Sequence, residues 1–76
     1  MARIIRATPR ENYCLEVMLD TGSSIVLSFK NRLETIRFGM LADQEFFKKV
    51  TTDGICISWE DKIEISLSEV FQLAQR

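Results

Sequence analysis

Hydrophobic and polar residues alternate with a period of two through much of the first half of the chain, a pattern typical of strands with one buried face. The clearest alternation runs from Tyr13 to Leu19. One face of that segment carries Tyr13, Leu15, Val17 and Leu19. A shorter strand is predicted over Ala2–Thr8, because β-branched residues there precede Pro9, which lacks a backbone donor and suits an edge strand.

Turn residues separate this strand from a third one. Residues 20–23 read Asp-Thr-Gly-Ser, and Gly22 can adopt the positive φ that a tight turn requires. The alternation then resumes with Ile25, Leu27 and Phe29. The second and third strands are therefore predicted to form a hairpin.

The middle of the chain is less regular. The polar segment Lys30–Arg37 fits either a connecting loop or one helical turn. Met40–Val50 is predicted to be a short helix, with Asp43 capping its start. The apolar stripe of this helix comprises Leu41, Phe46, Phe47 and Val50.

A second hairpin and a C-terminal helix follow. Asp53-Gly54 is a strong hairpin signal that joins Lys49–Thr52 to Ile55–Trp59, and a reversal at Glu60–Asp61 leads into a strand over Lys62–Ile65. Ile55, Ile57 and Trp59 share one face. Ser66 and Glu69 have the spacing of a capping box, which predicts a helix start. The expected inward residues of that helix are Leu67, Val70, Phe71 and either Leu73 or Ala74.

This order of elements predicts one α+β domain over residues 1–76. The domain is expected to hold a mostly antiparallel sheet of hairpins and one or two short helices, including a C-terminal helix. The predicted core consists of Leu15, Val17, Leu19, Ile25, Leu27, Phe29, Leu41, Phe46, Ile57, Trp59, Ile65, Val70 and Phe71.

Composition restricts the chemistry of so short a chain. It has no histidine, and its two cysteines, Cys14 and Cys56, are far apart. This excludes Ser-His and Cys-His nucleophilic machinery and most zinc sites. We therefore expect no catalytic residue, no metal and no cofactor, and no small-molecule substrate is evident. The formal net charge of −1 gives no reason to expect nucleic acid, and the lack of a long apolar run predicts a cytoplasmic protein without a membrane partner.

Residues 20–24 read Asp-Thr-Gly-Ser-Ser, the string found in pepsin-like aspartic proteases. That chemistry needs a second aspartate about 3 Å from Asp20, supplied by a second lobe or an identical subunit, on a scaffold of roughly 100 residues per half. This chain is shorter. The same residue types are standard in hairpin turns, which is the interpretation we adopt. A dimeric aspartic-protease-like hydrolase acting through Asp20 remains the alternative.

Two features suggest a partner surface. Arg3, Arg6 and Arg10 form an acid-free basic stretch that suits an acidic partner or phosphates, although such charges also protect an edge strand from pairing. Of two adjacent aromatic residues in a helix, only one can point into the buried stripe, so the other is expected to form an exposed apolar patch with Met18 and Met40. The predicted partner-binding residues are Met18, Phe46, Phe47, Arg3, Arg6 and Arg10.

The order and spacing of several features carry a family resemblance. They are the strand before Pro9, the alternation from Leu15 to Leu19, the turn at 20–22, Phe38 with Leu41, Asp43 with Phe47, Val50, the segment 57–59 reading Ile-Ser-Trp, and Ile65 leading to Glu69 and Phe71. From about Arg3 to Phe71 the chain resembles the small bacterial domain-of-unknown-function family 2442. The segment 60–64 departs from the Asn-Gly-x-Asp pattern of many relatives.

The resemblance implies a compact α+β domain that occurs alone or in front of a helix-turn-helix domain. It implies no activity and no catalytic residue. Standalone members are often encoded beside another small protein, which suggests a toxin–antitoxin-like or regulatory pair. We therefore expect a non-enzymatic protein-interaction or regulatory module, acting as a homodimer or as one member of such a pair. The alternatives are the Asp20 hydrolase and a nucleic-acid-associated regulator that uses the basic edge.

Overall fold

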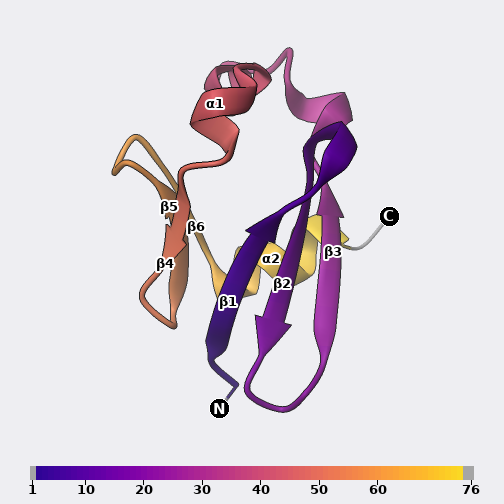
Figure 1. The fold of residues 1–76 in the computed structure, drawn as a ribbon, viewed down its shortest axis with the longest axis vertical. Helices are drawn as coiled ribbons and strands as arrows, with labels where there is room; N and C mark the ends of the chain where they lie inside the picture. Colours follow the sequence, from indigo (N-terminus) through magenta and orange to yellow (C-terminus); the bar gives the residue numbers. More distant parts are fainter. Residues whose placement is uncertain (1, 75–76) are drawn as a thin grey trace.

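The computed structural model describes residues 2–74 as two three-stranded antiparallel sheets with a C-terminal helix (Figure 1). The first sheet has the order β1-β2-β3, with bounds Ile4–Pro9, Cys14–Leu19 and Ser24–Ser28. The second has the order β4-β5-β6, with bounds Val50–Thr52, Cys56–Trp59 and Ile63–Ser66. The predicted α+β class is confirmed. Met1 and residues 75–76 of the predicted domain lie outside the described residues.

The alternation of the N-terminal strands fixes which side chains enter the core. Leu15 lies opposite Leu27, and Val17 lies opposite Ile25, on the buried face of β2 and β3. The register of β1 against β2 shifts between Ile4 and Arg6, so the strand carries a bulge there. The predicted hairpin of β2 and β3 is present, and the turn between them contains Gly22 with φ +91°.

The second sheet contains the two predicted reversals. The β4–β5 turn contains Gly54 with φ +100°, and the β5–β6 turn places Glu60 and Asp61 at φ 53° and 62°. Ile55 does not share the buried face of Ile57, contrary to the prediction. It precedes β5 in the turn, where its side chain remains 59% exposed.

The predicted helix over Met40–Val50 is wrong in length. A 3₁₀ turn covers Gly39–Ala42, and α1 covers Gln44–Phe47 only. Asp43 separates the two because its backbone is extended, and its Oδ1 accepts a hydrogen bond from Glu45 N at 3.0 Å, which confirms the predicted cap. The segment Lys30–Arg37, for which the sequence fits either a loop or one helical turn, contains a short 3₁₀ turn over Lys30–Arg32.

Helix α2 (Leu67–Ala74) begins at the predicted cap, where Glu69 N donates to Ser66 Oγ at 3.2 Å. It contacts both β6 and β3, and in Figure 1 it lies behind the first sheet. Val70 is buried, but Phe71 remains 44% exposed, so its predicted core position is wrong. Phe71 lies about 100° around the helix from Val70, which directs it off the buried stripe. No helix within residues 2–74 is long and apolar enough to cross a membrane.

The core lies between the two sheets and is closed by α1, α2 and the segment before α1. Its centre is an aromatic cluster in which Phe29 packs edge-on against Trp59 at 5.7 Å between ring centroids. Trp59 Nε1 donates to the backbone oxygen of Phe47 at 3.0 Å, which satisfies the one polar atom of the indole. Ile25 is only half-buried, although it was predicted to be in the core. The buried residues that the sequence pattern missed are Ile4, Phe38, Phe47 and Ile63.

Candidate functional site

One face of the first sheet is not covered by α2, which packs on the opposite face (Figure 1). We call it the outer sheet face. The register and the strand alternation place on it Arg6, Thr8, Cys14, Glu16, Met18, Ser24, Val26 and Ser28. Val26 lies in the middle of the edge strand β3, opposite Glu16, and remains 62% exposed. Val26 and the half-buried Met18 are apolar positions on a face that is otherwise largely polar, and hollows adjoin both of them. We therefore treat this face as a candidate binding surface.

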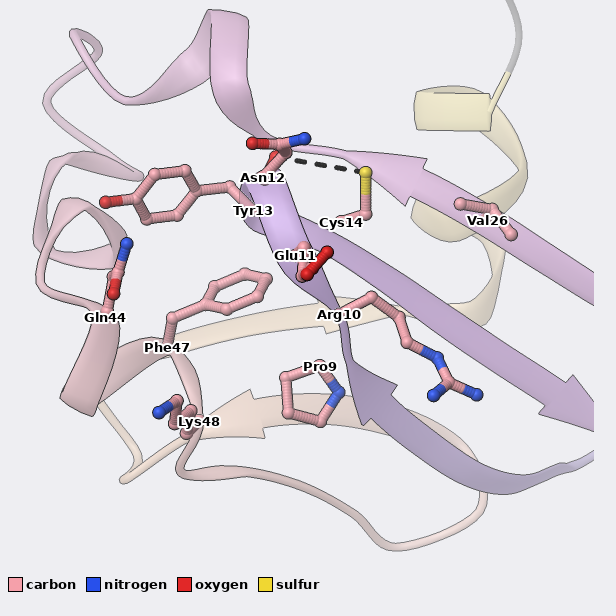
Figure 2. A pocket seen from close by; sticks show the side chains of 10 residues that line it. All are labelled: Pro9, Arg10, Glu11, Asn12, Tyr13, Cys14, Val26, Gln44, Phe47 and Lys48. Atoms are coloured by element: carbon pink, nitrogen blue, oxygen red, sulfur yellow. Dashed lines mark hydrogen bonds between the residues drawn. The ribbon is translucent and has the colours of Figure 1, made fainter.

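An open depression of about 990 Å³ adjoins this face, and Figure 2 shows its lining. It extends from Val26 on β3, over the connection between β1 and β2, to α1. Its apolar lining comes from Pro9, Tyr13, Cys14, Val26 and Phe47. Its polar and charged lining comes from Arg10, Glu11, Asn12, Gln44 and Lys48. A smaller hollow of about 510 Å³ lies on the outer sheet face itself, between Arg6, Thr8, Arg10, Glu16 and Met18.

The rim of the depression contains two consecutive residues in the left-handed region, Asn12 (φ 60°) and Tyr13 (φ 59°). Asparagine tolerates this conformation, but for a tyrosine it is unfavourable by about 1–2 kcal/mol. Three contacts hold Tyr13 in place. Its hydroxyl donates to Ala42 O at 2.7 Å, its carbonyl accepts from Phe29 N at 2.9 Å, and its ring packs edge-on against Phe47. The surrounding fold therefore fixes the shape of this rim.

The three predicted basic residues do not form one surface. Arg6 and Arg10 both line the hollow on the outer sheet face, where Arg10 Nε donates to Glu16 Oε1 at 3.0 Å. Arg6 makes no ion pair with any residue in the described part of the chain. The guanidinium of Arg3 instead lies against Gly54, in the turn between β4 and β5. Charge for a partner is therefore available at Arg6 and, in part, at Arg10.

The expectation that Phe46 or Phe47 would be exposed is wrong. Their side chains retain 8% and 3% exposure, because α1 is only one turn long and the chain bends on both sides of it. Both aromatic rings therefore reach the core, although Phe47 also lines the floor of the depression. Of the two methionines in the expected patch, Met18 is half-buried in the hollow, and Met40 is exposed in the 3₁₀ turn before α1.

The two cysteines differ in their surroundings. Desolvation, with smaller effects of Glu64 and Asp53, raises the pKa of the Cys56 thiol, which keeps it protonated at neutral pH. Cys14 Sγ lies 3.9 Å from Asn12 O, beside the depression. Within residues 2–74 no three Asp, Glu, His or Cys side chains are grouped as a metal site would require.

The structure places Asp20 in the turn after β2, at the surface. Its Oδ1 accepts a hydrogen bond from Arg3 N at 3.1 Å, and its own N donates to Arg3 O at 2.9 Å. Asp20 therefore joins the chain start to the β2–β3 turn. The Asp53 carboxylate holds the β4–β5 turn by accepting hydrogen bonds from the backbone N–H groups of Cys56 and Ile55. These hydrogen bonds lower the pKa of its carboxyl.

Sequence reasoning missed most residues of the depression. Two of the residues predicted to bind a partner, Arg10 and Phe47, are part of its lining. The alternation of Ile25, Leu27 and Phe29 implies that Val26 points to the opposite face, so its apolar character was a signal that could have indicated this surface. The approach of α1 to the β1–β2 connection depends on tertiary packing, and no local pattern indicates it.

No family model, curated protein or solved structure that was compared with the chain matches it. The resemblance to family 2442 therefore stays a prediction.

Proposed function

We propose that the protein is a non-enzymatic interaction module that binds a protein partner on the outer sheet face and in the adjoining depression. The observation that carries this proposal is the continuity of the two hollows. They share Arg10, and together they extend from Met18 to Lys48 on one side of the molecule. A partner bound there would cover Met18 and the apolar floor of the depression, which Pro9, Tyr13 and Phe47 form.

The charges around these hollows favour an acidic partner segment. Arg6 has no ion-pair partner within residues 2–74, and Lys48 approaches only the highly exposed Glu45, at 3.8 Å. An acidic side chain of a partner gains a charge-assisted hydrogen bond at Arg6 without breaking an existing ion pair. The Arg10–Glu16 ion pair lies at the surface and holds the guanidinium of Arg10 next to the depression. These groups act mainly on the rate and specificity of association.

The fixed rim supports the same proposal. Because Tyr13 is held by three contacts, the depression exists before a partner arrives, and binding requires little ordering of the chain. We further propose that the partner is the second member of a small two-protein pair in the cytoplasm.

The test identifies the polypeptides that co-purify with tagged protein from cells that produce it naturally. The protein carrying Arg6→Glu and Arg10→Glu is compared with wild type and with a charge-matched control, Lys30→Glu and Arg32→Glu, in the 3₁₀ turn after β3. We expect a polypeptide retained in stoichiometric amount by wild type and by the control, and lost from the Arg6/Arg10 variant. That polypeptide is then purified, and its binding is measured at two salt concentrations.

Retention that is equal in all three proteins contradicts the proposed surface. Failure to retain any polypeptide contradicts the proposed function. Circular dichroism of each variant excludes unfolding as the cause of a loss.

A further inference from the structure

The four edge strands of the two sheets differ in how they are protected from pairing. β1 carries a bulge, an arginine and Pro9, and it lies next to β4, with Ile4 N donating to Gly54 O at 2.8 Å. β4 in turn packs against β1. On β6 the backbone oxygen of Glu64 accepts a hydrogen bond from Arg37 Nη2 at 2.9 Å. β3 contacts α2, but within residues 2–74 it carries no bulge, proline or charged side chain, and no hydrogen bond is made to its outer edge.

The hydrogen bonding of β3 to β2 determines which of its backbone groups point outward. Phe29 N donates to Tyr13 O at 2.9 Å just beyond one end of the strand. Leu19 N donates to Ser23 O at 2.8 Å just beyond the other end. In an antiparallel ladder, hydrogen-bonded and non-hydrogen-bonded residue pairs alternate. Because residues 23 and 29 form hydrogen-bonded pairs with β2, the backbone groups of Ile25 and Leu27 also point toward β2. The backbone groups that point away from β2 belong to Ser24, Val26 and Ser28.

The side chains of this edge favour self-pairing. Residues 24–28 read Ser-Ile-Val-Leu-Ser, with no charge and no proline, and the polar residues are symmetric about Val26. In an antiparallel pair centred on Val26, Ser24 lies opposite Ser28 of a second copy, and Ile25 lies opposite Leu27. The charge next to Val26 on β2, Glu16, is already paired with Arg10. No like charges therefore meet across the new edge.

We propose that two copies of the chain pair through β3, antiparallel and with a two-fold axis at Val26, to form a continuous six-stranded sheet. Three outward-facing residues on each strand give about six new backbone hydrogen bonds. The two Val26 side chains, each 62% exposed in one copy, cover each other on the outer sheet face. The pairing covers Val26 but leaves Arg6, Arg10 and the hollow around them open. This dimer and the partner binding tested at those two arginines can therefore fail independently.

The first test measures the molar mass of the full chain by size-exclusion chromatography with light scattering over a concentration series. We expect the mass of two chains for wild type and of one chain for Val26→Pro. Proline removes the outward N–H of Val26, but no bond to β2 uses that N–H, so the strand itself tolerates the change. Val26→Thr, which keeps the N–H and a branched side chain, is expected to remain a dimer.

A charge substitution gives an independent measurement. Val26→Lys places two ammonium groups opposite each other at the axis and is expected to raise the dimer dissociation constant about tenfold or more. Its matched control is Ile55→Lys, because Ile55 is exposed to a similar extent, 59%, but lies in the β4–β5 turn. We expect that control to dimerise like wild type.

Disulfide trapping tests the register. In a background with Cys14→Ser and Cys56→Ser, Val26→Cys is expected to form a cross-linked dimer under mild oxidation, because opposed residues there are about 5.5 Å apart between Cα atoms. Ser24→Cys alone is not expected to cross-link, whereas a mixture of Ser24→Cys and Ser28→Cys chains is. A monomeric wild type, a dimeric Val26→Pro, or cross-linking of Ser24→Cys alone overturns the proposal. In each of these cases the Arg6/Arg10 retention experiment still decides the proposed function.

Discussion

Arg37 and Glu69 join the segment after β3 to the first turn of α2, although 32 residues separate them in the sequence. Arg37 Nη2 donates to Glu69 Oε1 at 2.9 Å, and Nη1 donates to the other carboxylate oxygen. The same Nη2 donates to Glu64 O at the edge of β6. The hydrogen bond from Arg37 lowers the pKa of Glu69 and raises the pKa of Arg37. One guanidinium thus fixes a long connection, a helix start and a strand edge.

Replacing Glu69 by glutamine is expected to lower the free energy of unfolding by about 0.5–1 kcal/mol at neutral pH, a small value because the pair is partly exposed. Because the pKa of Glu69 is lower in the folded chain than in the unfolded chain, its carboxylate stabilises the fold fully at pH values above the pKa of the unfolded chain. This stabilisation is lost as the pH falls through the lowered pKa of the folded chain. The difference between wild type and Glu69→Gln should therefore be largest at neutral pH and vanish in acid. Urea unfolding followed by Trp59 fluorescence measures it.

The control for this prediction is Glu45→Gln. Glu45 pairs with Lys48 at 3.8 Å and is highly exposed, so its replacement should change stability little at any pH. A pH dependence that is the same for Glu45→Gln and Glu69→Gln would show that net charge, and not the Arg37 contact, is responsible.

Trp59→Phe should be among the most destabilising single changes to the core. The substitution leaves a cavity and removes the only indole N–H, which donates to Phe47 O at 3.0 Å in a buried position. We expect a loss of about 2–4 kcal/mol, measured by urea unfolding with circular dichroism. Tyr13→Phe, which removes a more exposed hydrogen bond to Ala42 O, should cost less, about 0.5–1 kcal/mol. Equal losses of stability for the two variants would contradict the claim that burial makes the Trp59 contacts more stabilising than the Tyr13 hydrogen bond.

The β5–β6 turn offers a stabilising change. Glu60 and Asp61 both have positive φ, as a type I′ turn requires, but the preferred residues there are Asn and Gly. The double variant Glu60→Asn, Asp61→Gly is expected to raise the free energy of unfolding by about 0.5–2 kcal/mol, despite loss of the surface pair between Glu60 and Lys49. Thermal unfolding gives the comparison. An unchanged or lower midpoint would refute the strain assigned to this turn.

Local signals in the sequence predict the strands and turns of this fold well. The alternation of β2 and β3, the turn at Gly54 and the cap at Ser66 each depend on neighbouring residues, and each is found where it was predicted. Features that depend on distant packing were predicted less well. Asp43 caps α1 but also breaks the helix before it, and only tertiary contacts of Phe46 and Phe47 decide that both rings are buried.

The candidate site follows the same division. The alternation alone assigns Val26 to the outer sheet face, whereas the depression arises because α1 folds back against the β1–β2 connection. Arg3 shows the limit of reading charge along the chain. It belongs to the same basic stretch as Arg6, but it lies against Gly54 in another turn.

The left-handed rim of the depression gives the last prediction. Asn12 has φ 60° and ψ 34° and is exposed, so its backbone conformation is the main property that a substitution changes. Asn12→Gly should alter the free energy of unfolding by less than about 0.5 kcal/mol, because glycine adopts this conformation without a steric penalty. Asn12→Val should lower it by about 1–2 kcal/mol, since a β-branched residue is disfavoured there. Urea unfolding of both variants, with Glu11→Val as a neighbouring control, separates this effect from the loss of a polar side chain. If Asn12→Val were as stable as Asn12→Gly, the rim would not be held in the conformation on which the preformed depression depends.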